Sequence, residues 1–148
     1  MTYSIIILAA GKGSRFKSNE HKSLAAVQFA EGSLKRLIRQ LKAIDVKHEI
    51  VIVTGHQSAS IMSSLTQDFS NINFVHNINF SNGSLLDSIC VGVKAVTKGQ
   101  GAWVLFADTL YHKAALERLL QEPAETITLA CLPIEANQVD SIGISFRS

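Results

Sequence analysis

Short runs of apolar, largely β-branched residues alternate along this chain with segments in which apolar residues recur at helical spacing. The strand-like runs are residues 5–10, 50–53, 72–75, 102–107, 126–132 and, more weakly, 142–146. The helical segments are residues 33–44, 61–65, 85–96 and 116–120. Continuous apolar runs are typical of strands that are buried on both faces of a parallel sheet. The alternation therefore predicts an α/β layered fold with a mainly parallel sheet.

The side chains within these elements lead to further expectations. Ser33 is expected to cap the first helix. Asp45 and the charged segment 47–49 are expected to end it. The apolar residues of the third helix are expected to share one helical face; they are Leu85, Leu86, Ile89, Val93 and Val96. We expect Trp103 and most phenylalanines to lie in the core. Cys90 and Cys131 are interpreted as reduced, buried thiols, because two cysteines make neither a disulfide framework nor a cysteine-based zinc site.

Length and composition limit the class of protein. The chain has 148 residues, of which 47% are hydrophobic and 18% charged, with a net charge of +2. These values exclude disordered and fibrous classes and predict one globular domain over residues 1–148. The small charge gives no support for a nucleic-acid or membrane partner. No targeting or spanning segment is evident, so a cytoplasmic location is expected.

Three loops are expected to share one edge of the sheet. Ligands of parallel α/β sheets bind outside the carboxyl ends of the strands. The loops that follow strand-like runs at this edge are residues 11–23, 77–84 and 108–112. The fold class therefore selects these three segments before any motif is considered.

The first loop has the composition of an anion-binding loop. Gly11 and Gly13 let the backbone approach a ligand closely with its N–H groups turned inward, and Lys and Arg residues surround them. The pattern is not a Walker loop, and it is not the dinucleotide fingerprint, whose third glycine would fall at Phe16. It favours a polyphosphate ligand. The alternative is a solvated basic loop without a ligand.

The other two loops are open to two interpretations each. Asp108 comes directly after an apolar strand and is suited to hold Mg²⁺ between triphosphate oxygens, or it caps the helix that begins near His112. The asparagines and serines of residues 77–84 could read a base or a sugar. The preferred alternative for that loop is ordinary turn chemistry, with Ser84 capping the next helix.

The opening segment from Leu8 to Arg15, followed by Lys22, resembles the signature of nucleotidyltransferases with a MobA-like or sugar-nucleotidyltransferase fold. The resemblance continues in order through about residue 120. It implies a Rossmann-like three-layer α/β/α fold. It also implies a Mg²⁺-dependent enzyme that moves a nucleotide from an NTP to a phosphorylated small molecule and releases pyrophosphate. Because domains of this family run longer, we expect their last strands and helices to be absent from these 148 residues.

The resemblance also implies roles for single residues. Arg15 and Lys22 would be catalytic, contacting the outer phosphates and neutralising charge at the α-phosphate, and Asp108 would hold Mg²⁺. The implied nucleotide-binding residues are Leu8, Ala10, Gly11, Lys12, Gly13, Ser14, Asn82 and Ser84. In-line attack on an α-phosphate needs alignment and charge stabilisation rather than a covalent enzyme intermediate, which suits these residue types.

Three departures keep a second hypothesis open. His21 stands where the family usually has proline, the chain is short, and Glu135 and Asp140 are the only acids after Glu125 that could supply a second metal ligand. The alternative is therefore a catalytically silent relative that binds NTP. A dinucleotide-binding oxidoreductase is a third hypothesis, disfavoured because Thr54 and Gly55 end the second strand where an acid is expected.

The acceptor is left open between a sugar phosphate, phosphocholine and a pterin cofactor, with CTP slightly preferred as the nucleotide. Tyr111 could face a choline through a cation–π contact, but packing at the sheet edge is the preferred interpretation. If a C-terminal layer is missing, apolar surface is left exposed, and a second copy of the chain would cover it.

Overall fold

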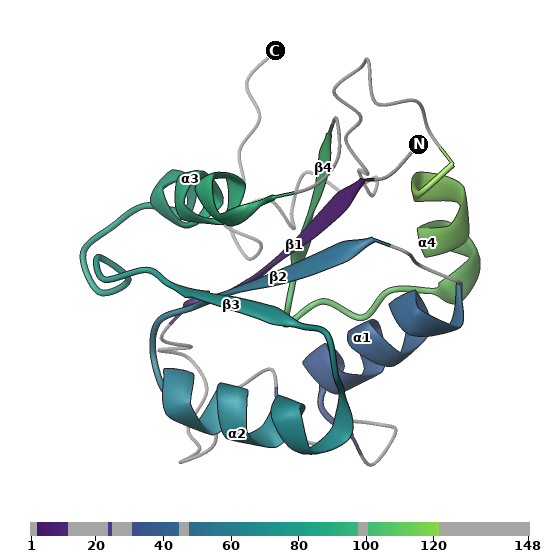
Figure 1. Cartoon of the computed structure of the whole chain (residues 1–148), viewed down its shortest axis with the longest axis horizontal. Helices are drawn as coiled ribbons and strands as arrows, with labels where there is room; N and C mark the ends of the chain where they lie inside the picture. The colour runs from purple at the N-terminus through teal and green to yellow at the C-terminus, as the bar shows by residue number, and fades with distance from the viewer. Residues whose placement is uncertain (1–2, 12–23, 25–30, 45–47, 98–100, 122–148) are drawn as a thin grey trace, which may run out of the picture.

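The computed structural model describes residues 3–11, 24, 31–44, 48–97 and 101–121, and all strands in that part are parallel. Four strands form one sheet in the order β3-β2-β1-β4 (Figure 1). The strands are β1 (Ser4–Ala9), β2 (Glu49–Thr54), β3 (Asn73–His76) and β4 (Ala102–Phe106). The helices are α1 (Ser33–Ala43), α2 (Ser58–Asp68), α3 (Leu85–Ala95) and α4 (Lys113–Leu119). The expected parallel sheet is confirmed, and the strands expected at 126–132 and 142–146 lie outside the described residues.

Helices cover both faces of the sheet. Successive side chains of a strand point to opposite faces, and every residue of β1 is buried, so both faces have to be covered. Ile5, Ile7 and Ala9 pack in a cluster with the buried residues of α1, α2 and α4. Ile6 and Leu8 face the other way and pack with residues of α3. Figure 1 shows α1, α2 and α4 on one side of the strands and α3 on the other. The three-layer α/β/α arrangement expected from the sequence is therefore confirmed.

The helix α3 packs on the sheet through its smallest side chains rather than through its large apolar ones. Ser88 and Gly92 are buried, whereas Leu85, Leu86 and Val93 are 55%, 65% and 52% exposed. A Cβ at Gly92 would lie 2.5 Å from Cγ2 of Ile6, so the absence of a side chain there permits the close approach. The apolar residues that helical spacing groups on one face are therefore exposed at these three positions.

Two smaller expectations were wrong, and one phenylalanine is an exception to the expected burial. The N-cap of α1 is Gly32 rather than Ser33, whose buried hydroxyl instead donates a hydrogen bond of 2.6 Å to the carbonyl oxygen of Ala107. Cys90 is exposed, because α3 turns its small-residue face inward. Phe106 is 39% exposed, because β4 presents it to the side of the sheet that α3 covers only in part.

The amino ends of the strands are held together by one carboxylate. Glu49 accepts hydrogen bonds from the Ser4 hydroxyl at 3.1 Å and from the Asn73 amide at 2.9 Å. It also accepts bonds from the backbone N–H and the hydroxyl of Thr97, which follows α3. The network joins β1, β2, β3 and the end of α3 at the edge opposite the expected ligand edge.

Beside this network, His48 gives the fold a predicted pH dependence. Burial lowers the pKa of His48 below its ordinary value of 6.5. Its Nδ1 accepts the backbone N–H of Tyr3 at 3.1 Å, a contact that requires an unprotonated nitrogen. Below pH 6.5 the unfolded chain binds a proton that the folded chain resists, so stability is expected to fall as the pH drops from about 7 to about 5.

Thermal unfolding at several pH values checks this expectation. The loss of stability on acidification should be smaller in His48→Gln than in the parent, and unchanged in His112→Gln, which alters an exposed histidine. Equal pH dependence in the parent and in His48→Gln would contradict the assignment.

Candidate functional site

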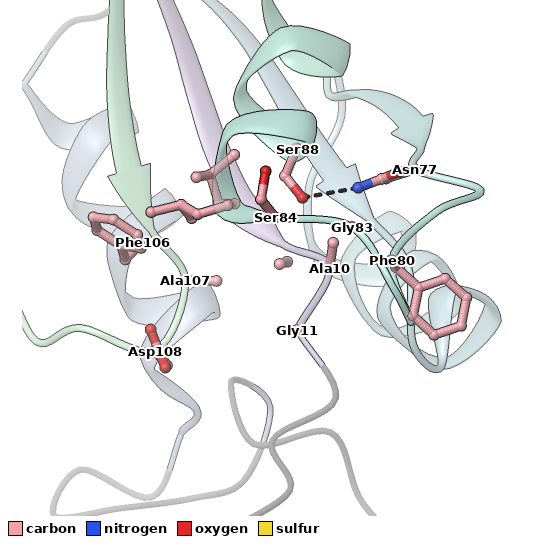
Figure 2. A pocket seen from close by; sticks show the side chains of 13 residues that line it. Ala10, Gly11, Asn77, Phe80, Gly83, Ser84, Ser88, Phe106, Ala107 and Asp108 are labelled. Carbon is pink, nitrogen blue, oxygen red and sulfur yellow. Dashed lines mark hydrogen bonds between the residues drawn. The ribbon is translucent and has the colours of Figure 1, made fainter. Parts of the chain in front are cut away.

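A pocket of about 270 Å³ lies at the carboxyl edge of the sheet. Three segments line it: residues 8–11 at the end of β1, residues from Asn77 to Ser88 around the start of α3, and residues 106–108 at the end of β4. Figure 2 shows the end of β1 between the other two segments. Its volume is near the lower end of the roughly 300–1,000 Å³ typical of small-molecule sites.

The end of β1 forms the centre of the pocket because its backbone is held from both neighbours. The carbonyl oxygen of Leu8 accepts the N–H of Ala107 at 3.1 Å, and that of Ala10 accepts the N–H of His56 at 3.2 Å. Leu8, Ala10 and Gly11, all expected nucleotide-binding residues, line the pocket. The other expected residues of this loop lie outside the described residues; they are Lys12, Gly13, Ser14, Arg15 and Lys22.

Asp108 lines the pocket across from the end of β1. It comes directly after β4, and its side chain is exposed. The Ser33 hydroxyl binds the carbonyl of the preceding residue, Ala107, and so ties this wall to α1. The N-cap of α4 is His112, so the alternative in which Asp108 caps that helix was wrong. The placement that the sequence predicts for Asp108, at the ligand edge of the sheet, is confirmed.

The loop before α3 combines turn chemistry with a place on the pocket wall. The Ser84 hydroxyl accepts the N–H of Asp87, and the Asp87 carboxylate accepts the N–H of Ser84, which makes a capping box. The hydrogen bonds that Ser84 donates to the Asp87 carboxylate lower the pKa of Asp87. The capping interpretation of Ser84 is thus confirmed, although the residue also lines the pocket. Asn82 is exposed and is not among the lining residues.

Two polar residues of the pocket are buried; Asn77 belongs to the loop that the sequence indicated, whereas Ser88 was missed by sequence reasoning. Asn77 is 2% exposed and Ser88 is 8% exposed, and the Asn77 amide nitrogen donates to the Ser88 hydroxyl oxygen at 2.9 Å (Figure 2). The signal that could have found Ser88 is the row of small residues Ser84, Ser88 and Gly92, which share one face of a helix at a spacing of four.

Phe80 and Gly55 fix the outer end of this loop. A Cβ at Gly55 would lie 2.5 Å from the Phe80 Cβ and 2.7 Å from the Ala10 carbonyl oxygen. The Phe80 ring lies 6.3 Å from the ring of His56 and 6.0 Å from that of His76. Only a glycine at position 55 leaves room for Phe80 to pack against the end of β1.

Tyr111 packs at the edge of the sheet, as preferred from the sequence. Its hydroxyl oxygen accepts the N–H of Phe106 at 2.8 Å, and its ring packs against the core cluster on the side of α1. Burial raises the pKa of Tyr111. It is not among the residues that line the pocket, so the proposed contact with choline has no support from its position.

The residues of the pocket fit a metal ion that is bound mainly by the phosphates of a substrate and only in part by the protein. Within the described part of the chain, no three His, Cys, Asp or Glu side chains gather around a common metal position. Asp108 supplies one exposed carboxylate at the wall that faces Gly11. One or two carboxylates together with substrate phosphates are the usual protein environment of Mg²⁺.

Fold and site together define a class. A parallel α/β sheet with a pocket at the carboxyl ends of its strands, Gly11 after β1 and a carboxylate after β4 is a Rossmann-like domain of the kind that binds ligands at this edge. Among the helices of the described ranges, none is long and apolar enough to cross a membrane.

Comparison with known proteins gives the family. The sequence model of the MobA-like NTP transferase domain matches residues 5–141, so the chain belongs to that family of nucleotidyltransferases. The bifunctional protein GlmU of Sulfurimonas denitrificans is 32% identical over 128 residues. That match covers 84% of this chain and 27% of GlmU, so the chain spans about a quarter of the length of that relative.

Solved structures share the fold. A nucleotidyl transferase from Methanothermobacter thermautotroptrophicus superimposes with a TM-score of 0.66 at 24% identity, over 80% of this chain and 56% of the other. The CTP:phosphocholine cytidylyltransferase LicC of Streptococcus pneumoniae gives a TM-score of 0.61 at 22% identity, over 73% and 46% of the two chains. The present chain covers about half of each, and the likeness supports the Rossmann-like fold.

Proposed function

We propose that this chain transfers the nucleotidyl group of an NTP to a phosphorylated small molecule, with Mg²⁺ as its metal and pyrophosphate as the leaving group. The observation that carries the proposal is the pocket between Gly11 and Asp108 in a chain of the MobA-like NTP transferase domain family. An acceptor phosphate oxygen would attack the α-phosphorus, and the bond to the β-phosphate oxygen would break.

The residues have distinct parts in this proposal. The backbone after β1 would bind the triphosphate, with Arg15 at the outer phosphates and Lys22 at the α-phosphate, where negative charge develops. Asp108 would hold Mg²⁺ at the opposite wall. When bound, the metal would neutralise negative charge on the phosphates and so favour departure of pyrophosphate. The walls of the pocket would hold the two anionic reactants in line.

The acceptor belongs to the same proposal. LicC, by its name, acts with CTP and phosphocholine, and a sugar phosphate or a pterin cofactor would serve equally as a phosphorylated acceptor. We retain CTP as the slightly preferred nucleotide. The exposed Leu85, Leu86 and Val93 form an apolar surface on α3, and a homo-oligomer that covers it stays a prediction for light scattering.

The test combines binding with turnover. Titration calorimetry with CTP, UTP, GTP, ATP and dTTP, each with and without Mg²⁺, should reveal at least one nucleotide whose binding depends on the metal. Pyrophosphate release should then follow when phosphocholine, a sugar 1-phosphate or a phosphorylated pterin is added. The silent alternative predicts binding without turnover of any acceptor.

Lys22→Ala is expected to lower pyrophosphate release by about 100-fold, since it removes charge stabilisation at the α-phosphate. Lys94→Ala, an exposed lysine on α3, is the matched control and should leave the rate unchanged. Equal rates in the parent and in Lys22→Ala would contradict the mechanism.

A further inference from the structure

The hydrogen-bond network around Asn77 determines the direction in which Ser88 offers its proton. The backbone N–H of Asn79 points to Oδ1 of Asn77 at 3.0 Å, and an N–H can only donate. Oδ1 is therefore the end of the amide that faces Asn79, and Nδ2 faces Ser88. The amide orientation follows from this network.

It follows that the Ser88 hydroxyl is an acceptor toward Asn77 and has its own proton available for another partner. Ser88 is more than nine-tenths buried and lines the pocket. Within the described residues, its bond from Asn77 is the one hydrogen bond that it makes. The Ser88 hydroxyl proton is therefore available to a ligand in the pocket that brings an acceptor.

The residues that line the pocket indicate which part of a ligand would lie beside Ser88. Leu8, Leu85 and Phe106 line the same pocket, so part of its wall is apolar. Asp108 and Gly11, which suit the metal and the phosphates, lie at the other end of the pocket from Ser88 in Figure 2. A flat, neutral group fits apolar walls better than a hydrated phosphate does.

We propose that Ser88, oriented by Asn77, is a specificity-determining residue that donates a hydrogen bond to a ring carbonyl oxygen of the nucleobase. The inference rests on the proposed function, because it assigns a base to one end of the NTP pocket. Cytosine, uracil, thymine and guanine carry such an oxygen, and adenine does not. The pocket should therefore bind one or more of these four NTPs in preference to ATP.

Calorimetry on the unaltered chain gives the first test, which no folding defect can obscure. CTP, UTP, GTP, dTTP, ATP and inorganic tripolyphosphate are titrated in the presence of Mg²⁺. We expect the preferred carbonyl-bearing NTP to bind about 3- to 10-fold more tightly than ATP, the value of one neutral hydrogen bond. ATP as the tightest ligand would overturn the inference while leaving the proposed function intact. Binding of no NTP would overturn both.

Two variants give the second test. Ser88→Ala should remove the preference over ATP and leave the affinity for tripolyphosphate unchanged. Asn77→Asp should do the same while keeping the Ser88 hydroxyl, because a carboxylate would accept the proton that Ser88 otherwise offers to the ligand. The conservative Ser88→Thr, which retains a donor, should retain the preference.

Other outcomes contradict the assignment in distinguishable ways. If Ser88→Ala weakens every NTP equally but not tripolyphosphate, the hydroxyl contacts the sugar rather than the base. If it weakens tripolyphosphate as well, Ser88 has only a structural role. If it changes no affinity, Ser88 does not contact the ligand. Each of these three results would overturn the proposal.

Discussion

Replacing Asp108 with alanine is expected to lower the rate of nucleotidyl transfer by about 10²- to 10³-fold. The carboxylate follows β4 at the pocket wall that faces the end of β1. A bound divalent metal supplies several kcal/mol of charge stabilisation in phosphoryl chemistry. Loss of about 3–4 kcal/mol of that stabilisation corresponds to the stated decrease in rate.

The measurement for Asp108 has two readouts. Pyrophosphate release gives the rate, and calorimetry gives the dependence of NTP affinity on Mg²⁺, which Asp108→Ala and the isosteric Asp108→Asn should both reduce. Glu117→Gln, on the surface of α4, is the control acid and should change neither quantity. If NTP binding by Asp108→Asn responds to Mg²⁺ as in the parent, Asp108 is not the metal ligand.

The chain-level pattern was sufficient to predict where the site lies. Continuous apolar runs such as residues 5–10 and 102–107 indicate parallel strands, and parallel strands place the loops after them at one edge. The placement of Gly11 and Asp108 at the same edge of the sheet follows from that rule alone, and both residues line the pocket there. The roles of Arg15 and Lys22 stay predictions, since both residues lie outside the described part of the chain.

The inner wall could not be predicted, because it depends on packing rather than on pattern. Hydrophobic periodicity groups Leu85, Leu86 and Val93 on one helical face, yet α3 turns Ser88 and Gly92 to the sheet. Gly92 permits a close approach that larger side chains would prevent, and the Asn77 amide donates a hydrogen bond to the buried Ser88 hydroxyl. A pattern that scores apolar residues alone does not detect a helix face made of small and polar ones.

Gly55 connects the stability of the fold to the geometry of the site, and Gly55→Ala is expected to affect both. The new Cβ would lie 2.5 Å from the Phe80 Cβ and 2.7 Å from the Ala10 carbonyl oxygen, and a backbone atom cannot move aside as a flexible side chain can. Such overpacking costs about 1–3 kcal/mol. Alanine recovers about 0.4–1 kcal/mol by restricting the unfolded chain, so the net change remains destabilising.

The same substitution should weaken nucleotide binding, because Ala10 and Phe80 both line the pocket and would have to separate. Thermal unfolding should show a lower Tm by about 3–10 °C, and calorimetry at a temperature where the variant is folded should show weaker NTP binding. Ile61→Val is the matched control. It removes a methyl group from the core on the opposite face of the sheet, at a cost of about 0.5–1.5 kcal/mol. It should lower the Tm without changing the affinity for NTP. An equal affinity in Gly55→Ala and the parent would show that the Phe80 contact maintains the fold but not the pocket.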